Sequence, residues 1–288
     1  MIKRQFILAI VVAMAATVGC DDDSGAPPED EPTELQQPSG DDEHQLDEEP
    51  VAEESTDEET TIDAAALPKL QTYGQLRNIN LQDDYSPSVG LYEGLNGKPD
   101  TALNQAVGAL GELSGEITVI DDTVYLGHAG DEPTFEQVGL DELDDELEAT
   151  ILFGAATNRW TEVDIGDARD LTSLQEHLQQ WRDEQGVDGP LSFRISDSQS
   201  QVDWHVVDGQ RIPEEGANSC EERKEFAHQF ETKDEPVRIA GLFTTDHTGV
   251  VVDHTTSIHA HVVTDDGKNG HIDELELSND AELKIAVH

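Results

Sequence analysis

A strongly acidic segment near the N-terminus limits where this chain can form a core. Residues 21–63 contain 19 Asp or Glu and no Lys or Arg, and they hold few large apolar side chains. Such a segment repels itself and has too little apolar surface to offset the entropy cost of folding. It is therefore predicted to be a disordered acidic tether, and the folded domain is expected in residues 64–288.

The formal net charge of -48 over 288 residues excludes two classes of partner. Nucleic acid and an anionic membrane surface both present negative charges that this chain would repel. Residues 64–288 alone carry 45 acidic and 14 basic side chains, which is typical of a surface adapted to a salty or external medium. Their length suffices for one large domain or two small ones, and we expect a single domain.

The first twenty residues have the order of a secretory signal peptide. Lys3 and Arg4 precede an apolar run over 6–18, which is too short to span a bilayer. The tetrapeptide at 17–20, Thr-Val-Gly-Cys, resembles the lipobox of bacterial lipoproteins, in which the cysteine becomes the lipidated first residue of the mature protein. The alternative is an ordinary export signal with an incidental cysteine.

The lipobox resemblance implies an exported, membrane-anchored lipoprotein of the bacterial cell envelope. Lipidation of Cys20 would be its only link to the membrane, and the acidic tether would separate this anchor from the folded domain. With Cys20 lipidated, Cys220 has no cysteine partner. No intramolecular disulfide is therefore expected, despite the oxidising compartment.

The apolar pattern of the body predicts an α+β protein with mixed β-sheets and about two amphipathic helices. Two strands at 116–120 and 123–126 are predicted to form a hairpin, and another strand is predicted at 150–155. A strand that begins at Phe193 is expected to pair with one at 201–207, and strand patterning returns through 237–287. Helices are predicted at 170–185, where Asp170 is a suitable cap, at 219–231, where Ser219 and Glu222 form a capping box, and as a short element at 101–110.

Three histidines near the end of the chain form the candidate site. His259 and His261 are two residues apart, so on a strand they share one face. Residues 264–270 are turn-forming, and His271 opens the next strand, so a hairpin would bring it beside the first two. Three neutral imidazoles suit Zn²⁺ or another divalent transition metal and leave coordination positions open for a substrate. The alternative is a chance pairing among 11 histidines.

Several segments of the body together resemble one enzyme family. They are residues 239–245 (Ile-Ala-Gly-Leu-Phe-Thr-Thr), 258–266 (Ile-His-Ala-His-Val-Val-Thr-Asp-Asp) and 270–272 (Gly-His-Ile). Upstream, the glycine-rich segment 108–116 ends in a Gly-Glu pair. The acetolactate decarboxylase family carries a Gly-Phe strand segment, a His-x-His, a Ser/Thr-Asp-Asp turn and a Gly-Gly-His in this order. The likeness covers most of residues 74–287.

The resemblance implies a metalloenzyme of that fold, which converts 2-acetolactate, a 2-hydroxy-3-keto acid, to acetoin and CO₂. Zinc on His259, His261 and His271 would act as a Lewis acid on the substrate oxygens. A nearby carboxylate would orient the substrate or manage the proton that replaces CO₂, and the Gly-Glu match selects Glu116. The alternative for Glu116 is a solvent-facing strand residue. A homodimer is compatible with the sequence.

This chain also departs from the family pattern. The family uses an active-site Arg in a strand after the Phe193 region. Continuing the match from Phe193 without a gap places His205 at that position, whereas a pattern of Arg followed by Pro selects Arg211, which we prefer. Relatives supply another active-site Glu after the third histidine, for which this chain has no counterpart, and Asn269 stands where Gly is common. These departures favour an alternative function: a non-catalytic, envelope-anchored metal- or ligand-binding module of the same fold.

Overall fold

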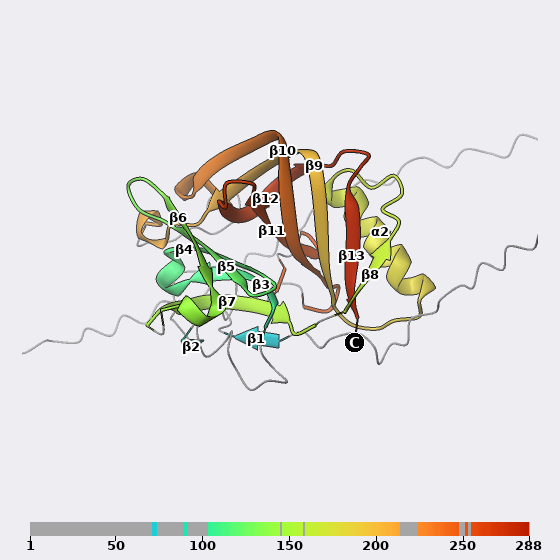
Figure 1. Ribbon diagram of the computed structural model, residues 1–288, viewed down its shortest axis with the longest axis horizontal. Coiled ribbons are helices and arrows are strands. Elements are labelled where there is room, and N and C mark those ends of the chain that lie inside the picture. The colour runs from blue at the N-terminus through green and yellow to red at the C-terminus, as the bar shows by residue number, and fades with distance from the viewer. Residues whose placement is uncertain are drawn as a thin grey trace, which may run out of the picture. The chain divides into compact units, whose positions relative to one another are not determined.

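The computed structural model describes residues 103–144, 146–157, 159–213, 224–247, 251–252 and 255–287, together with the backbone of 71–73 and 89–90. These residues form two antiparallel β-sheets, the α-helix α2 (Leu171–Glu184), a short stretch of helical backbone at 224–226 and short 3₁₀ turns (Figure 1). Cys20, Cys220 and the predicted signal and tether lie outside the described residues, so the domain boundary at residue 64 stays a prediction. No helix in the described part is long and apolar enough to cross a membrane.

The first sheet, sheet A, is built around a meander of neighbouring strands. Its members, in order across the sheet, are β1 (Gln71–Tyr73), β7 (Glu148–Ala155), β3 (Gln105–Leu110), β4 (Gly115–Ile120), β5 (Thr123–His128) and β6 (Thr134–Gly139), and β2 (Val89–Gly90) also pairs with β7. The predicted hairpin at 116–126 is confirmed as β4 and β5, and the predicted strand at 150–155 is confirmed as β7.

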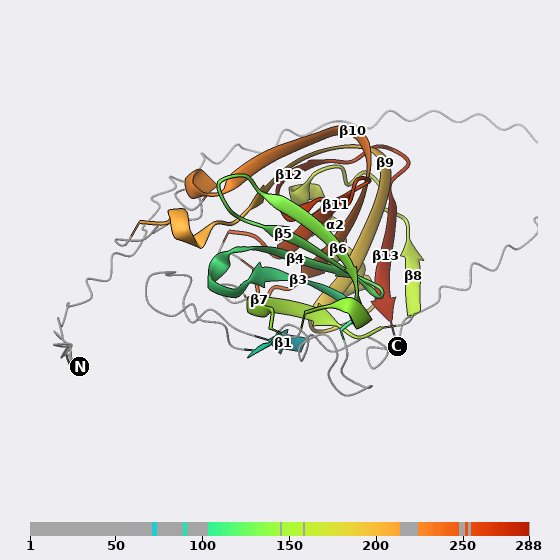
Figure 2. The ribbon, with the colours of Figure 1, turned by 60° about the vertical axis from the view of Figure 1, so that its left-hand side comes forward.

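The second sheet, sheet B, contains the strands of the C-terminal half. Its order is β10 (His228–Phe243), β11 (Ile258–Thr264), β12 (Asn269–Glu276), β9 (Leu191–Val206), β13 (Glu282–Val287) and β8 (Arg159–Val163). The long strands β9 and β10 also pair with each other, so β10, β11, β12 and β9 close into a ring of hydrogen-bonded neighbours. Their curvature can be followed in Figures 1 and 2.

The α-helix α2 (Leu171–Glu184) packs against the apolar side of sheet B. Its buried Leu174, Leu178 and Trp181 belong to the same core cluster as the inward side chains of β9. The predicted capping residue is confirmed: the Asp170 carboxylate accepts a hydrogen bond from the Ser173 N–H at 2.7 Å, and the Ser173 hydroxyl accepts one from the Asp170 N–H. This reciprocal pair satisfies N–H groups that the first helical turn leaves free.

The opposite face of sheet B packs against sheet A, and the alternation of β4 determines what is presented there. Ile117 and Val119 point into the core on the far side of sheet A, with other apolar residues of that sheet. The intervening Glu116 and Thr118 must therefore point toward sheet B. Apolar residues of both sheets, including Phe153 and Leu242, fill the rest of this interface.

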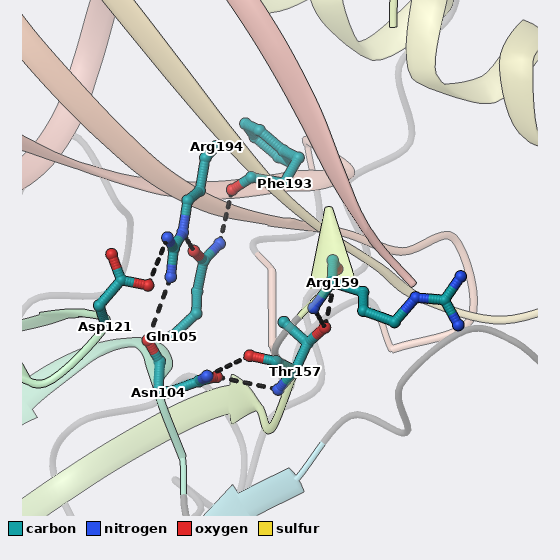
Figure 3. A network of polar contacts seen from close by, with 7 residues as sticks. All are labelled: Asn104, Gln105, Asp121, Thr157, Arg159, Phe193 and Arg194. Carbon is teal, nitrogen blue, oxygen red and sulfur yellow. Dashed lines mark hydrogen bonds and ion pairs between the residues drawn. The ribbon is translucent and has the colours of Figure 1, made fainter. Parts of the chain in front are cut away.

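A polar network joins the two sheets at another point of their interface (Figure 3). The guanidinium of Arg194, on β9, donates to the Gln105 side chain, to the Asp121 carboxylate at 2.8 Å and to the Asn104 carbonyl at 3.2 Å. Gln105 in turn donates to the Phe193 carbonyl at 2.6 Å. The Arg194 side chain is largely buried and stacks on Trp160, so its donors are satisfied by sheet A rather than by water.

Three predictions of secondary structure are wrong. The short helix at 101–110 is replaced by strand β3, whose residues are all buried between β4 and β7. The two strands predicted from Phe193 and at 201–207 are one 16-residue strand, β9. The helix predicted to continue to 231 has ended before His228, where β10 begins; helical backbone is described at 224–226, and 214–223 lie outside the described residues.

Candidate metal centre

The hairpin of β11 and β12 brings the three predicted histidines together. His261 on β11 lies directly opposite His271 on β12, and His259, two residues before His261, lies on the same face of β11. The Thr264 hydroxyl closes the connecting turn by donating to Asp266 at 2.6 Å and accepting from the Lys268 N–H at 3.0 Å. One nitrogen from each of the three rings lies within 4.8 Å of the others, so the predicted convergence is confirmed.

Hydrogen bonds on the far side of two rings determine which nitrogens remain free. The His259 Nδ1 lies 2.9 Å from the Val251 carbonyl, which can only accept, so this nitrogen carries the proton and Nε2 is a free electron-pair donor. The His261 Nδ1 lies 3.0 Å from the Thr118 hydroxyl. The His261 Nε2 is buried and has no hydrogen-bond partner among the described residues, as expected of a metal-binding nitrogen.

Glu116 faces these histidines from sheet A and is buried rather than solvent-facing, with 4% of its surface exposed. Its Oε1 accepts a hydrogen bond from the Val207 N–H at 3.0 Å, where the chain leaves β9. Its Oε2 lies 3.6 Å from the His261 Nε2. The carboxyl group is thereby oriented toward the nitrogens that would hold a metal.

Burial controls the protonation of the whole cluster. Desolvation lowers the pKa of His259 to about 4, and it lowers the pKa of His261 and His271 well below the ordinary value, with further lowering by the neighbouring imidazoles. Desolvation also raises the pKa of Glu116 well above its ordinary value, although the Val207 hydrogen bond opposes this. Neutral imidazoles are the form that binds a metal, so these rings need lose no proton near neutral pH.

Asn269 and Thr118 support the site; the sequence marked Asn269 only as a departure from the family pattern, and it gave no indication of Thr118. The fully buried Asn269 side chain donates to the Thr118 hydroxyl at 3.2 Å and to the Glu116 carbonyl at 3.4 Å. One amide therefore joins β12 to the strand that carries Glu116. These partners lie more than 150 residues apart in the sequence, so no local pattern indicates the contact.

The two candidates for the family arginine position lie in different surroundings. Arg211 is an exposed residue of a 3₁₀ turn (Gly209–Arg211), and its Nη1 lies 3.5 Å from the His228 Nδ1. His205, on β9, lies directly opposite His271, and the centroids of the two rings are 5.1 Å apart. The structure thus brings His205, rather than Arg211, beside the three histidines.

The sequence matches the family model described as alpha-acetolactate decarboxylase over residues 103–288, which is more than half of the chain. The chain belongs to the alpha-acetolactate decarboxylase family. No match was found among curated proteins.

Solved structures of this family share the fold. An acetolactate decarboxylase from Bacillus subtilis subspecies spizizenii is 14% identical with a TM-score of 0.55, and the match covers 76% of this chain and 86% of that one. The alpha-acetolactate decarboxylase of Bacillus subtilis strain 168 is 15% identical, with the same TM-score and coverage. A Staphylococcus aureus protein of unknown function, similar to alpha-acetolactate decarboxylase, is 14% identical, also at 0.55, with 76% and 85% covered. The predicted α+β, acetolactate decarboxylase-like fold is confirmed.

Proposed function

We propose that this protein is a metal-dependent decarboxylase that converts 2-acetolactate to acetoin and CO₂. The observation that carries the proposal is the convergence of three histidine nitrogens with the buried carboxyl group of Glu116. Family membership supports the reaction class, and the chemistry of the residues supports the site.

The residues present fit a divalent transition metal. Three imidazoles form the donor set, the Nε2 of His261 is an orphaned buried polar atom, and the Val251 carbonyl orients His259. Imidazole nitrogens suit Zn²⁺ and its neighbours in the first transition series. Such an ion would supply Lewis acidity that draws electron density from the substrate oxygens as CO₂ leaves.

The protein must then deliver one proton to the substrate. Breaking the bond between C1 and C2 releases CO₂ and leaves an electron pair shared with the adjacent keto group; a proton must be added at C2 to give acetoin. Burial raises the pKa of Glu116 well above its ordinary value, which favours the protonated form of its carboxyl group, and the Val207 N–H restrains Oε1 so that Oε2 faces the histidines. Glu116 Oε2 is therefore our candidate for the atom that delivers this proton.

The proposal is tested with purified full-length protein loaded with Zn²⁺ and given racemic 2-acetolactate. We expect acetoin from the native protein, loss of bound zinc and of acetoin in His259→Ala, and retained zinc with at least a hundredfold lower rate in Glu116→Gln. Arg211→Met tests whether that residue binds the substrate, by a raised KM. Absence of acetoin from the zinc-loaded native protein would contradict the enzymatic function.

A non-catalytic metal- or ligand-binding module is the second candidate function. It is favoured by the position of Arg211, whose guanidinium contacts His228 instead of the three histidines. Zinc bound without turnover, and lost in His259→Ala, is the result expected for this alternative. Unchanged zinc content in His259→Ala would contradict both functions.

We also propose that the protein is exported and anchored in the cell envelope through a lipid on Cys20. The order of basic, apolar and small residues before this cysteine supports the proposal. Expressed in a bacterial host, the native protein is expected in the membrane fraction and Cys20→Ser in a soluble or uncleaved form. Equal membrane retention of both, with the signal removed from Cys20→Ser, would contradict lipid anchoring.

A further inference from the structure

A fourth histidine lies in line with two of the predicted metal ligands. Across sheet B, His261 is opposite His271, and His271 is opposite His205, so three adjacent strands contribute one imidazole each to a row. Directly opposed residues of neighbouring strands point to the same face of a sheet. His205 therefore points to the face that sheet A covers, where Glu116 and Thr118 lie.

The His205 ring is held in place from one side. Its Nδ1 lies 2.8 Å from Oδ2 of Asp273, and the other oxygen of that carboxylate lies 2.7 Å from the Lys224 ammonium. Asp273 is on β12, two residues after His271, and only 13% of its side chain is exposed. Lys224 neutralises the carboxylate, and the carboxylate acts as acceptor for the Nδ1–H of His205.

The other ring nitrogen of His205 makes no such contact. Its Nε2 has no hydrogen-bond partner among the described residues, although the side chain is only 13% exposed. A positive charge on His205 would lower the pKa of His259, His261 and His271 alike, so the ring lies within electrostatic range of all three. A carboxylate that orients one nitrogen and leaves the other free is the arrangement of a histidine that contacts a ligand.

We propose that His205 is a substrate-binding residue of this site, whose Nε2 accepts a hydrogen bond from the hydroxyl group of a bound 2-hydroxy carboxylate. The inference rests on the proposed function for the substrate class and adds the residue that recognises the hydroxyl. With Nδ1–H donated to Asp273, the free Nε2 is an acceptor, which distinguishes a hydroxyl donor from a hydrogen or methyl group at the same carbon. Asp273 and Lys224 are positioning residues, because they act through His205.

The test measures preference for the hydroxyl group with unreactive ligands. Full-length, zinc-loaded protein is titrated in a calorimeter with 2-hydroxy-2-methylpropanoate and with 2-methylpropanoate, which lacks the hydroxyl. We expect the native protein to prefer the hydroxy acid, and His205→Phe to reduce that preference about five- to tenfold, which is the range for one lost hydrogen bond. His205→Gln, which keeps an acceptor, is expected to retain part of the preference.

Two further variants separate the role of the His205 ring from that of its partner Asp273 and from a general effect of removing a histidine. Asp273→Asn is expected to give a smaller loss of preference than His205→Phe, because the ring is retained but loses its charged partner. His177→Ala, a half-buried histidine of α2 whose ring lies beside Gly166, is the control and should match the native protein. Zinc stoichiometry is measured for every variant.

The outcomes distinguish this inference from the proposed function. Lower zinc content in both His205→Phe and His205→Gln would overturn it by making His205 a metal ligand, and an unchanged preference with full zinc would overturn it directly. If the native protein yields no acetoin yet His205→Phe loses the hydroxyl preference, the decarboxylase function fails and the binding role of His205 stands.

Discussion

At the scale of single residues, burial of the imidazoles between two sheets prepares them for a metal at a cost in acid tolerance. An ordinary histidine gains a proton as the pH falls through about 6.5, whereas burial lowers the pKa of His259 to about 4. The rings are thus neutral over a wide range of pH. Between these two values, however, the unfolded chain binds a proton that the folded chain does not.

This difference predicts the pH dependence of stability for the metal-free protein. Above pH 6.5 both states are neutral at His259; as the pH falls toward 4 the unfolded state is favoured by up to about 1.4 kcal/mol per pH unit, and below 4 the loss levels off. Urea denaturation with a chelator present, at pH 7 and pH 5, measures it. His259→Gln should lose less stability than the native protein over this interval, and identical losses would contradict the assignment.

The residues that carry the chemistry and those that support them differ in how well sequence could identify them. His259, His261 and His271 follow from strand alternation and a recognisable turn, and Glu116 follows from a family motif. Thr118, Asn269 and Asp273 carry no such signal. Their contacts cross between strands that are distant in the chain, and one amide or hydroxyl among many is singled out only by the packing of the two sheets.

At the scale of elements, the β11–β12 hairpin depends on one glycine next to a predicted ligand. Gly270 precedes His271 and packs against β9: a Cβ atom there would lie 2.4 Å from the His205 carbonyl oxygen and 2.4 Å from the Trp204 ring. Neither backbone nor indole can yield without moving β9. The smallest residue is therefore required where the hairpin joins the ring of strands.

Gly270→Ala is predicted to disturb both fold and site. We expect a loss of about 1–3 kcal/mol in the free energy of unfolding from overpacking, and weaker zinc binding because His271 shifts with its strand. Gly130→Ala is the control, since its nearest neighbour would be the Glu132 carbonyl oxygen at 3.7 Å. Urea denaturation and competition with a zinc chelator measure the two effects. Native-like behaviour of Gly270→Ala in both would show that β9 accommodates the methyl group.

The errors in predicting elements have a common physical origin. Residues 105–110 include Ala and Leu, which favour helices, yet pairing on both edges makes them a buried strand in which Gly108 packs against the Ile151 carbonyl. Phe230 was expected on a helix, but it stacks on Trp204 from β10 with ring centroids 4.3 Å apart. In both cases tertiary pairing overrides local propensity. The helix at 170–185 was predictable because its cap and apolar spacing are local.

At the scale of the whole molecule, the two sheets are held together by an apolar interface and by the Arg194 network. Arg194 satisfies acceptors on sheet A from a largely buried position, and Gln105 returns a hydrogen bond to sheet B (Figure 3). Lys284 is the neighbour of Arg194 across the strands, but its ion pair with Glu162 is far more exposed. Arg194 and Lys284 therefore differ in how much they contribute to the free energy of unfolding.

Arg194→Met is predicted to lower the free energy of unfolding by about 2 kcal/mol, because several buried acceptors lose their donor. Lys284→Met should change it by less than about 0.5 kcal/mol, as is usual for an exposed ion pair. Both are measured by urea denaturation of the metal-free protein. Equal losses in the two variants would mean that the network adds little to the apolar interface.

The contact of Thr118 with His261 joins residues that are 143 positions apart, and it has a consequence for when the protein can acquire its ion. During synthesis, the strand that carries Glu116 leaves the ribosome long before the histidine hairpin exists. The first sheet can form early, but high-affinity capture of zinc must wait until His271 has been made. A bound ion would then report that the β11–β12 hairpin has formed against the first sheet, and a chain truncated before β12 could not be rescued by adding metal.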